Sequence, residues 1–158
     1  MPQFSTKRRV RHSAANMFDL VVDMEKYPQF VPLCTALKVR SRTPKGEGVS
    51  VVIAEMTVAY KLIRQTFVTR DTLDRSNLKI LVEYLDGPFR RMTNRWTFNP
   101  AGEGACEVEF FIDYEFRSRT LGALMGSMFD VAFRKFADAF EERANKIYGV
   151  AKLSKDPA

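Results

Sequence analysis

The sequence predicts an α+β fold, in which a curved antiparallel sheet of seven strands packs against one long C-terminal helix. Residues 106–116 predict a strand with one dry face, because every even position from Cys106 to Phe116 is apolar and most odd positions are acidic. Residues 121–148 predict the helix, because apolar residues recur there at spacings of three and four. Strand-like segments joined by tight turns fill most of the chain before this pair, an order typical of an antiparallel meander.

The first elements are expected to be a strand over residues 3–12 and a helix over residues 14–24, with Ser13 as its N-cap. Pro28 and Pro32 follow, and their spacing predicts a rigid corner or a short second helix rather than a long one. The remaining strands are expected at residues 34–43, 49–60, 63–73, 78–85, 90–98 and 105–117, before the helix at 121–148.

The long helix must bury an apolar stripe that runs from Leu121 through Leu124 to Ile147. The only predicted surface large enough is one face of the sheet, so we expect the sheet to curl around the helix. Alternation along the strands indicates which side chains should face the helix: Met56, Val58, Val82, Tyr84, Trp96, Phe110, Ile112 and Tyr114. The same alternation points Lys79, Glu83, Glu107 and Glu109 outward.

A chain of 158 residues has the size of one domain, which we expect at residues 1–149, with a flexible tail at 150–158. The sequence has neither an apolar run long enough for a membrane span nor the pattern of a secretory signal, and we expect a cytoplasmic protein. Cys34 and Cys106 stand far apart without a metal-binding spacing, which favours two buried, reduced thiols.

The formal net charge of +6 allows two interpretations. A basic surface favours phosphate-rich or anionic-lipid partners. Alternatively, the basic side chains pair across strands with the acidic positions of residues 106–116, which would neutralise much of the field. The basic residues concerned are Lys7, Arg8, Arg9, Arg11, Arg90, Arg91, Arg95, Arg117 and Arg119.

Catalytic motifs are lacking in the sequence. His12 is the single histidine and is interpreted as structural, since it has no partners at metal-ligand spacing. The sequence has no glycine-flanked serine elbow and no phosphate-binding glycine loop. We therefore expect a protein that is not an enzyme, with no catalytic residue, no metal and no required cofactor.

Gly122 and Gly126 open the long helix with a spacing of four residues. This spacing favours close packing of the helix on the sheet. The alternative is a hinge, because each interior glycine costs about 1 kcal/mol relative to alanine and would soften the first turns.

Several motifs in this order resemble those of the coenzyme Q-binding branch of the START-like, polyketide cyclase/lipid-transport superfamily. They are Tyr27-Pro28-Gln29-Phe30-Val31-Pro32 followed by Cys34, Asp86-Gly87-Pro88-Phe89, Trp96-Thr97-Phe98, Ala139-Phe140-Glu141-Glu142-Arg143-Ala144 and Ile147-Tyr148-Gly149. The resemblance covers residues 4–149. It implies a helix-grip fold, in which the seven-stranded antiparallel sheet wraps the long helix and leaves an apolar tunnel.

The resemblance also implies a function: binding of ubiquinone or a related polyprenyl lipid by a non-enzymatic carrier or chaperone that supports respiration. The tunnel would be lined by Tyr27, Phe30, Val31, Leu33, Met56, Val58, Tyr84, Phe89, Trp96, Phe110, Ile112, Tyr114, Leu124, Met125 and Met128. Its mouth, in transient contact with an anionic membrane at the inner face, would be formed by Pro28, Pro32, Gly87, Pro88, Arg117 and Arg119.

Two alternatives stay open. The same branch contains a bacterial ribosome-association toxin, which implies binding to the large ribosomal subunit through basic surface. The wider superfamily contains cyclases and aromatases, although the sequence offers no evident acid-base pair for such chemistry. The identity and tail length of the ligand, the cavity volume and the oligomeric state are left open by the sequence.

Overall fold

The structure, a computed structural model, describes residues 3–149. Its elements in chain order are β1 (Gln3–Val10), α1 (Ala14–Val22), the 3₁₀ helix η1 (Met24–Gln29), β2 (Cys34–Gly46), β3 (Val49–Tyr60), β4 (Ile63–Asp74), β5 (Lys79–Asp86), β6 (Phe89–Pro100), β7 (Cys106–Phe116) and α2 (Arg119–Tyr148). This is the order expected from the sequence, and the α+β prediction is confirmed. The tail expected at residues 150–158 lies outside the described residues.

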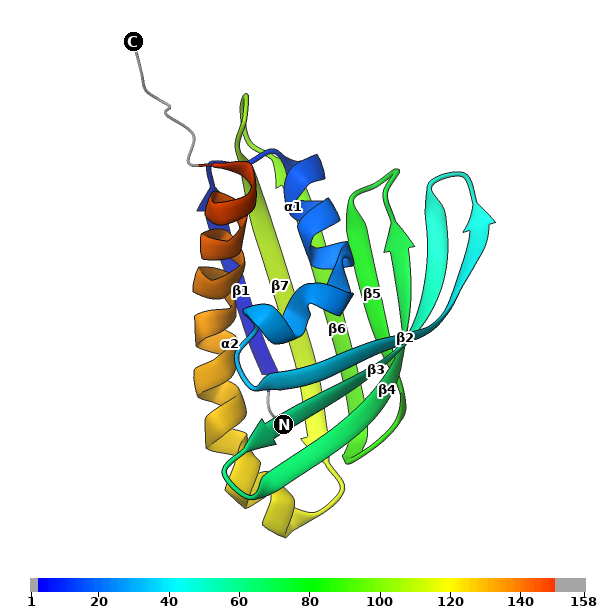
Figure 1. Ribbon diagram of the computed structural model, residues 1–158, viewed down its shortest axis with the longest axis vertical. Coiled ribbons are helices and arrows are strands. Elements are labelled where there is room, and N and C mark those ends of the chain that lie inside the picture. Colours follow the sequence, from blue (N-terminus) through cyan, green and yellow to red (C-terminus); the bar gives the residue numbers. More distant parts are fainter. Residues whose placement is uncertain (1–2, 150–158) are drawn as a thin grey trace.

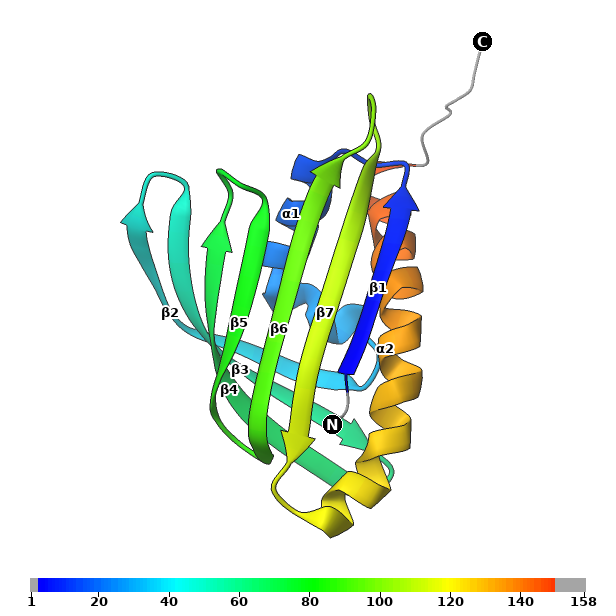
Figure 2. The ribbon, with the colours of Figure 1, turned by 180° about the vertical axis from the view of Figure 1, so that it is seen from behind.

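The strands form one seven-stranded sheet in the order β1-β7-β6-β5-β4-β3-β2, with every neighbouring pair antiparallel. The first strand therefore pairs with the last, and the others follow as a meander. Figure 1 shows the sheet curving around α2, with α1 and η1 on the same side. Seen from behind in Figure 2, the strands lie in front of the helices, so no helix of residues 3–149 covers the convex face.

Local hydrogen bonds explain where the helices begin. The hydroxyl of Ser13 accepts a hydrogen bond from the backbone N–H of Asn16 at 3.1 Å, which confirms it as the N-cap of α1. Ser118 caps α2 in the same way through the N–H of Leu121, so α2 starts two residues before the predicted position. Pro28 lies inside η1, and the corner expected from the prolines is therefore a short 3₁₀ helix.

Irregular pairing bends the sheet. The register shifts three times between β2 and β3, once between β4 and β5 at Val68/Thr69, and once between β6 and β7 at Phe89/Arg91. Such bulges increase the local twist and bend of a strand. They allow a single sheet to follow the curvature that enclosing α2 requires.

The core lies between the concave face and α2. Phe133 packs against Tyr114 with ring centroids 5.6 Å apart, and Phe140 packs against Trp96 at 5.1 Å. The predicted apolar stripe is largely correct, but its ends are not. Leu124 is 56% exposed and Ile147 is 48% exposed, because these two side chains face away from the sheet, whereas the nearby Met125 and Ala144 are fully buried.

His12 has a structural environment, as expected. Its ring is buried, and Nε2 lies 2.7 Å from the side-chain oxygen of Asn145 near the end of α2. Cys34 and Cys106 are buried free thiols, and burial raises the pKa of each thiol to about 11. Both therefore stay protonated at neutral pH.

Cross-strand ion pairs neutralise part of the basic surface. Arg91 on β6 contacts Asp113 at 3.0 Å and Glu115 at 2.6 Å, both on β7. Arg8 departs from the predicted pattern, since it reaches across to Asp138 and Glu141 on α2 instead of pairing within the sheet.

The two glycines of α2 are not required by packing. A Cβ atom at Gly122 would meet Phe116 at 3.7 Å, an ordinary contact, and one at Gly126 would meet nothing within 4 Å. The prediction of close packing is therefore wrong for Gly126, because a side chain at this position would have open space around it.

Replacing Gly126 by alanine should raise the free energy of unfolding by about 0.5–1 kcal/mol, since the helix gains propensity and the added methyl group has space. Chemical denaturation measures this value. The reverse change at a nearby exposed position, Ala123→Gly, is the control and should lower it by a similar amount. A destabilised Gly126→Ala variant would show that this helix position has a contact absent from the structure.

Candidate functional site

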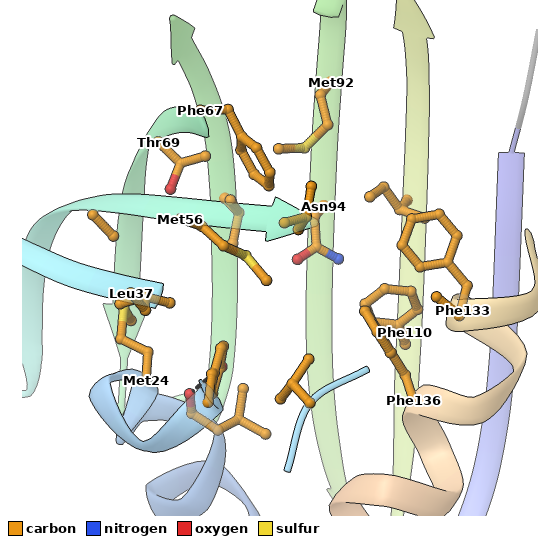
Figure 3. A pocket seen from close by; sticks show the side chains of 18 of the residues that line it. Met24, Leu37, Met56, Phe67, Thr69, Met92, Asn94, Phe110, Phe133 and Phe136 are labelled. Carbon is orange, nitrogen blue, oxygen red and sulfur yellow. Dashed lines mark hydrogen bonds between the residues drawn. The ribbon is translucent and has the colours of Figure 1, made fainter. Parts of the chain in front are cut away.

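A cavity of about 120 Å³ lies between the concave face of the sheet and α2. Figure 3 shows Met56, Phe67 and Met92 from the sheet and Phe133 and Phe136 from α2 projecting toward it. Every strand except β1 contributes to the lining, together with α1, η1 and the corner that follows η1. Because most lining side chains are apolar, the space suits an apolar molecule or part of one.

The structure brings together at this cavity many residues that the sequence assigned to a tunnel. Those that line it are Tyr27, Val31, Leu33, Met56, Val58, Phe89, Trp96, Phe110 and Ile112, together with Pro32, which was assigned to the mouth. Leu33 has a positive φ of 68°, an uncommon conformation for a leucine, at the corner between η1 and β2. The corner thus turns its apolar side chains inward.

Other residues assigned to the tunnel do not line this cavity: Phe30, Tyr84, Tyr114, Leu124, Met125 and Met128. Phe30 packs edge-on against Tyr27 and Phe140. The hydroxyl of Tyr84 accepts a hydrogen bond from the N–H of Phe89 at 3.0 Å. These side chains support the wall of the cavity rather than forming its surface.

The orientation of α2 is evident from Leu124, Met125 and Met128. Met125 is fully buried in the core, Met128 is partly buried beside it, and Leu124 faces away from the sheet. Adjacent positions on a helix point in directions about 100° apart, so Met125 and Leu124 cannot both face the cavity. The spacing alone did not reveal which of them faces inward.

The residues assigned to the mouth, apart from Pro32, lie outside the cavity lining. Pro28 lies inside η1. Arg117 connects the loop before α2 to the turn between β5 and β6. Its backbone N–H donates to the carbonyl of Pro88 at 3.0 Å, and its side-chain Nε donates to the carbonyl of Phe89 at 2.9 Å.

Gly87 has a φ of 141°, and a Cβ atom there would lie 2.6 Å from Cβ of Phe67. Arg119 is exposed at the start of α2.

Many lining residues were not assigned to the site from the sequence. They are Val21, Met24, Leu37, Ala54, Phe67, Thr69, Asp71, Ile80, Val82, Met92, Asn94, Phe129, Ala132, Phe133, Phe136 and Phe140. The aromatic residues among them on α2 belong to the recognised stripe, but the stripe does not indicate where packing leaves a gap. Thr69 and Asp71 share the alternation of Phe67 and Leu73 on β4, and this pattern could have placed them inside.

Asp71 is the unusual member of the lining. It is only 5% exposed, although it carries a carboxyl group. Among the described residues, the one recorded hydrogen bond to this carboxyl comes from the hydroxyl of Thr69, at 2.7 Å. Burial raises the pKa of Asp71 from 3.8 to about 6, and the hydrogen bond from Thr69 opposes part of that change.

The other polar groups of the lining have partners within the protein. Asn94 donates through Nδ2 to the carbonyl of Phe111 at 2.8 Å, and its Oδ1 accepts from Nε1 of Trp96 at 3.1 Å. The hydroxyl of Tyr27 donates to the carbonyl of Val21, and burial raises the pKa of Tyr27 well above its usual value. These two side chains are therefore held in place by the fold itself.

Residues 3–149 contain neither a metal-ion cluster nor a helix that could span a membrane. No three His, Cys, Asp or Glu side chains come together there as a group that could hold a metal ion. No helix in this range has the length and apolarity needed to cross a membrane.

The family model for polyketide cyclase / dehydrase and lipid transport proteins matches residues 10–141. Among curated proteins, the chain is 36% identical over 148 residues to the ribosome association toxin RatA of Escherichia coli K12, covering 94% of this chain and 90% of that protein. The persistence and stress-resistance toxin PasT of Escherichia coli O6:H1 matches to the same extent. A coenzyme Q-binding protein COQ10 homolog B from Xenopus laevis is 28% identical, covering 93% of this chain and 59% of that protein.

Solved structures share the fold. The 18 kDa protein CC1736 from Caulobacter crescentus superposes with a TM-score of 0.78 at 35% identity, covering 95% of this chain and all of that one. A START superfamily protein from Mycobacterium smegmatis superposes with a TM-score of 0.77 at 20% identity, covering 92% of this chain and 98% of that one. The START-like fold expected from the sequence motifs is therefore confirmed.

Replacing Asp71 by asparagine should make stability less dependent on pH. Because the pKa of Asp71 is raised from 3.8 to about 6, the folded state binds more protons between these values, and the wild type loses stability as pH rises through this window. At pH 8 the variant should therefore be more stable by on the order of 2–3 kcal/mol, and the difference should vanish near pH 4. Denaturation across this pH range measures it.

Asp74→Asn is the matched control on the same strand. A hydrogen bond from Asn77 lowers the pKa of Asp74, so the charged form stabilises the fold and its removal should reduce stability at neutral pH. An Asp71→Asn variant that is less stable than the wild type at pH 8 would contradict the destabilising role of the buried charge.

Proposed function

The chain belongs to the polyketide cyclase / dehydrase and lipid transport family, and on that premise we propose that it associates with the ribosome. The observation that carries this proposal is the 36% identity to RatA, named as a ribosome association toxin, over 94% of the chain. The sequence motifs alone had favoured a ubiquinone carrier and had placed ribosome binding second. The relatives favour the opposite order, since the COQ10 protein is less similar at 28% identity.

One end of the molecule supplies a surface suited to ribosomal RNA. Three connections meet there: the β3–β4 turn, the β5–β6 turn and the loop before α2. Backbone contacts hold the last two together, and Gly87 packs against Phe67 near the start of β4. We call this surface the basic end, and its exposed cationic residues are Lys61, Arg64, Arg90, Arg117 and Arg119.

Charge at the basic end is only partly neutralised. Arg90 has one distant ion pair, with Glu115 at 3.8 Å. The side chain of Arg117 donates a hydrogen bond from Nε to the backbone carbonyl of Phe89. Lys61 and Arg119 have no ion pair with any residue between 3 and 149. Because RNA phosphates exchange bound counterions for such side chains, contact with them supports binding that weakens as salt rises.

Apolar side chains are also exposed at the basic end. Leu62 is fully exposed at the tip of the β3–β4 turn, and Tyr60, Leu85 and Leu124 are exposed nearby along their elements. An aromatic or aliphatic side chain between cationic ones is typical of surfaces that contact nucleobases or protein as well as phosphate.

Ribosome association should depend on the basic end. In sedimentation with purified ribosomal subunits at increasing KCl, the double variant Lys61→Glu/Arg119→Glu should bind roughly ten-fold more weakly than the wild type, with a shallower dependence on salt. Lys45→Glu is the control, since Lys45 is exposed in the β2–β3 hairpin at the opposite end (Figure 1).

Two results would count against this proposal. If the wild type does not sediment with either subunit at low salt, ribosome association is excluded for the protein. If Lys45→Glu weakens binding as much as the double variant, the basic end is not the contact surface.

The cavity favours a second function, because association with a ribosome through surface residues does not require an internal cavity. We infer that it holds an apolar ligand, in line with the lipid transport part of the family description and the coenzyme Q-binding relative. Burial of each CH₂ group contributes about 0.8 kcal/mol, so a small apolar molecule can bind well. A carrier of ubiquinone that supports respiration and meets an anionic membrane at the basic end is the specific form of this function.

The volume of the cavity limits how much of a ubiquinone molecule it can hold. A cavity of about 120 Å³ has room for roughly one aromatic ring, whereas sites for whole drug-sized ligands usually measure ~300–1,000 Å³. A quinone ring therefore fits inside, and a polyprenyl tail requires the lining to move apart or the tail to lie outside the cavity.

Filling the cavity should remove the ligand. Organic extracts of protein purified from a membrane-containing lysate should yield a bound lipid by mass spectrometry for the wild type, and little or none for Val82→Phe, whose added ring occupies the space. Val131→Phe adds the same ring on the exposed side of α2 and should retain the lipid. Equal recovery from both variants would place the lipid elsewhere, and none from the wild type would exclude a tightly bound lipid.

A cyclase or aromatase remains the weakest of the three functions. The names of the similar curated proteins describe ribosome association and coenzyme Q binding rather than a reaction. Among the described residues that line the cavity, Tyr27 and Asp71 are the titratable ones, and the Tyr27 hydroxyl is already bonded to Val21. We therefore propose no catalytic role.

A further inference from the structure

We propose that Asp71 is the hydrogen-bond acceptor for a ligand with a hydroxylated aromatic ring, held in the cavity between the sheet and α2. This inference rests on the second proposed function, the binding of an apolar ligand in that cavity, and names the chemistry by which the ligand is recognised. It does not depend on ribosome association.

The position of Asp71 leaves its carboxyl group directed at the cavity. In the sheet it lies between Val52 on β3 and Val82 on β5, both apolar neighbours in register with it. Asp71 itself lines the cavity and is 5% exposed. Within residues 3–149, no Lys, Arg or His side chain lines the cavity with it, so this part of the chain offers the carboxyl no cation there.

The hydrogen-bonding capacity of this carboxyl exceeds what the protein supplies. A carboxylate has about four acceptor positions, and the recorded bond from Thr69 uses one of them. Asn94 and Tyr27, two other polar side chains of the same lining, are bonded to other groups. A carboxylate oxygen that faces a mostly apolar cavity and has no protein donor favours a donor brought by a ligand, because few other groups there can bond to it.

The size and walls of the cavity indicate what carries that donor. An engineered cavity of about 150 Å³ lined by apolar residues in another protein accepts one benzene molecule, and the volume here is about 120 Å³. Met24, Met56 and Met92 line it with flexible side chains that can adjust to a ring. Phe110 and Phe133 offer aromatic faces and edges. A single ring is therefore the part of a ligand that this space fits.

The donor is best a neutral hydroxyl group on that ring. A carboxylate accepts hydrogen bonds and cannot donate them, so a ring that carries only carbonyl oxygens gains nothing from Asp71. A phenolic hydroxyl donates one charge-assisted bond without bringing a second charge into the apolar space. Reduced quinones, which carry hydroxyl groups, fall within this class, and oxidised quinones do not.

Binding of phenol and of benzene, followed by chemical-shift changes in NMR titrations at pH 7.5, tests the proposal. The two molecules have nearly the same size and differ by the hydroxyl group. Without an acceptor, burial of that hydroxyl would make phenol the weaker ligand. With Asp71 present, phenol should bind at least as tightly as benzene.

The variant Asp71→Ala distinguishes the effect of the hydrogen-bond acceptor from that of the available volume, because it removes the acceptor and enlarges the cavity. Benzene should bind this variant as well as the wild type or better, while the affinity for phenol relative to benzene should fall at least roughly ten-fold. Asp74→Ala, a carboxyl removal outside the cavity, should leave this ratio unchanged.

The possible failures are distinguishable. If benzene binds but the phenol-to-benzene ratio is the same in the wild type and in Asp71→Ala, Asp71 does not recognise the ligand, while the cavity still binds apolar molecules. If neither probe perturbs the lining residues of the wild type, both this inference and the proposed cavity function are overturned.

Discussion

The burial of α2 is the constraint on which the rest of the structure depends. A 30-residue helix with an apolar stripe cannot remain exposed in water, and the chain provides one surface long enough to cover it, the sheet. Covering a cylinder requires a curved sheet, and the bulges between β2 and β3 and at Val68/Thr69 are where the strands bend. The helix thus determines the shape of the sheet.

The same constraint accounts for the cavity. Rings such as Phe110, Phe129 and Phe133 meet their neighbours at tilted or edge-on angles with centroids about 5–6 Å apart. Large rigid side chains arranged in this way on two curved surfaces do not fill all the space between them. What remains is a small apolar cavity with one carboxyl group, while the charged side chains of the basic end lie outside it. Ribosome association and ligand binding inside the cavity therefore use separate parts of the molecule, although a lipid carrier would also present the basic end to a membrane.

Much of the fold follows from the sequence, because strand alternation and helical spacing report directly on which face is buried. The positions of Trp96, Phe110 and Ile112 were predicted on this basis and are correct. The site was harder to predict, because a gap depends on how side chains from distant elements fit together. Leu124 was assigned to the tunnel and is exposed. Asp71 was not considered, since a charged residue in a strand usually faces water.

The pairing of β1 with β7 has a consequence for how the chain folds. Gln3 to Val10 find their partners at Cys106 to Asp113, so the first strand has no neighbour until the last one has been made. Contacts between such distant segments form late, because closing a long loop is entropically unfavourable. During synthesis the meander from β2 to β6 can assemble first, leaving the N-terminal strand unpaired. The helix α2 is made after β7, and its addition brings Asn145 to His12 and supplies the helical side of the cavity.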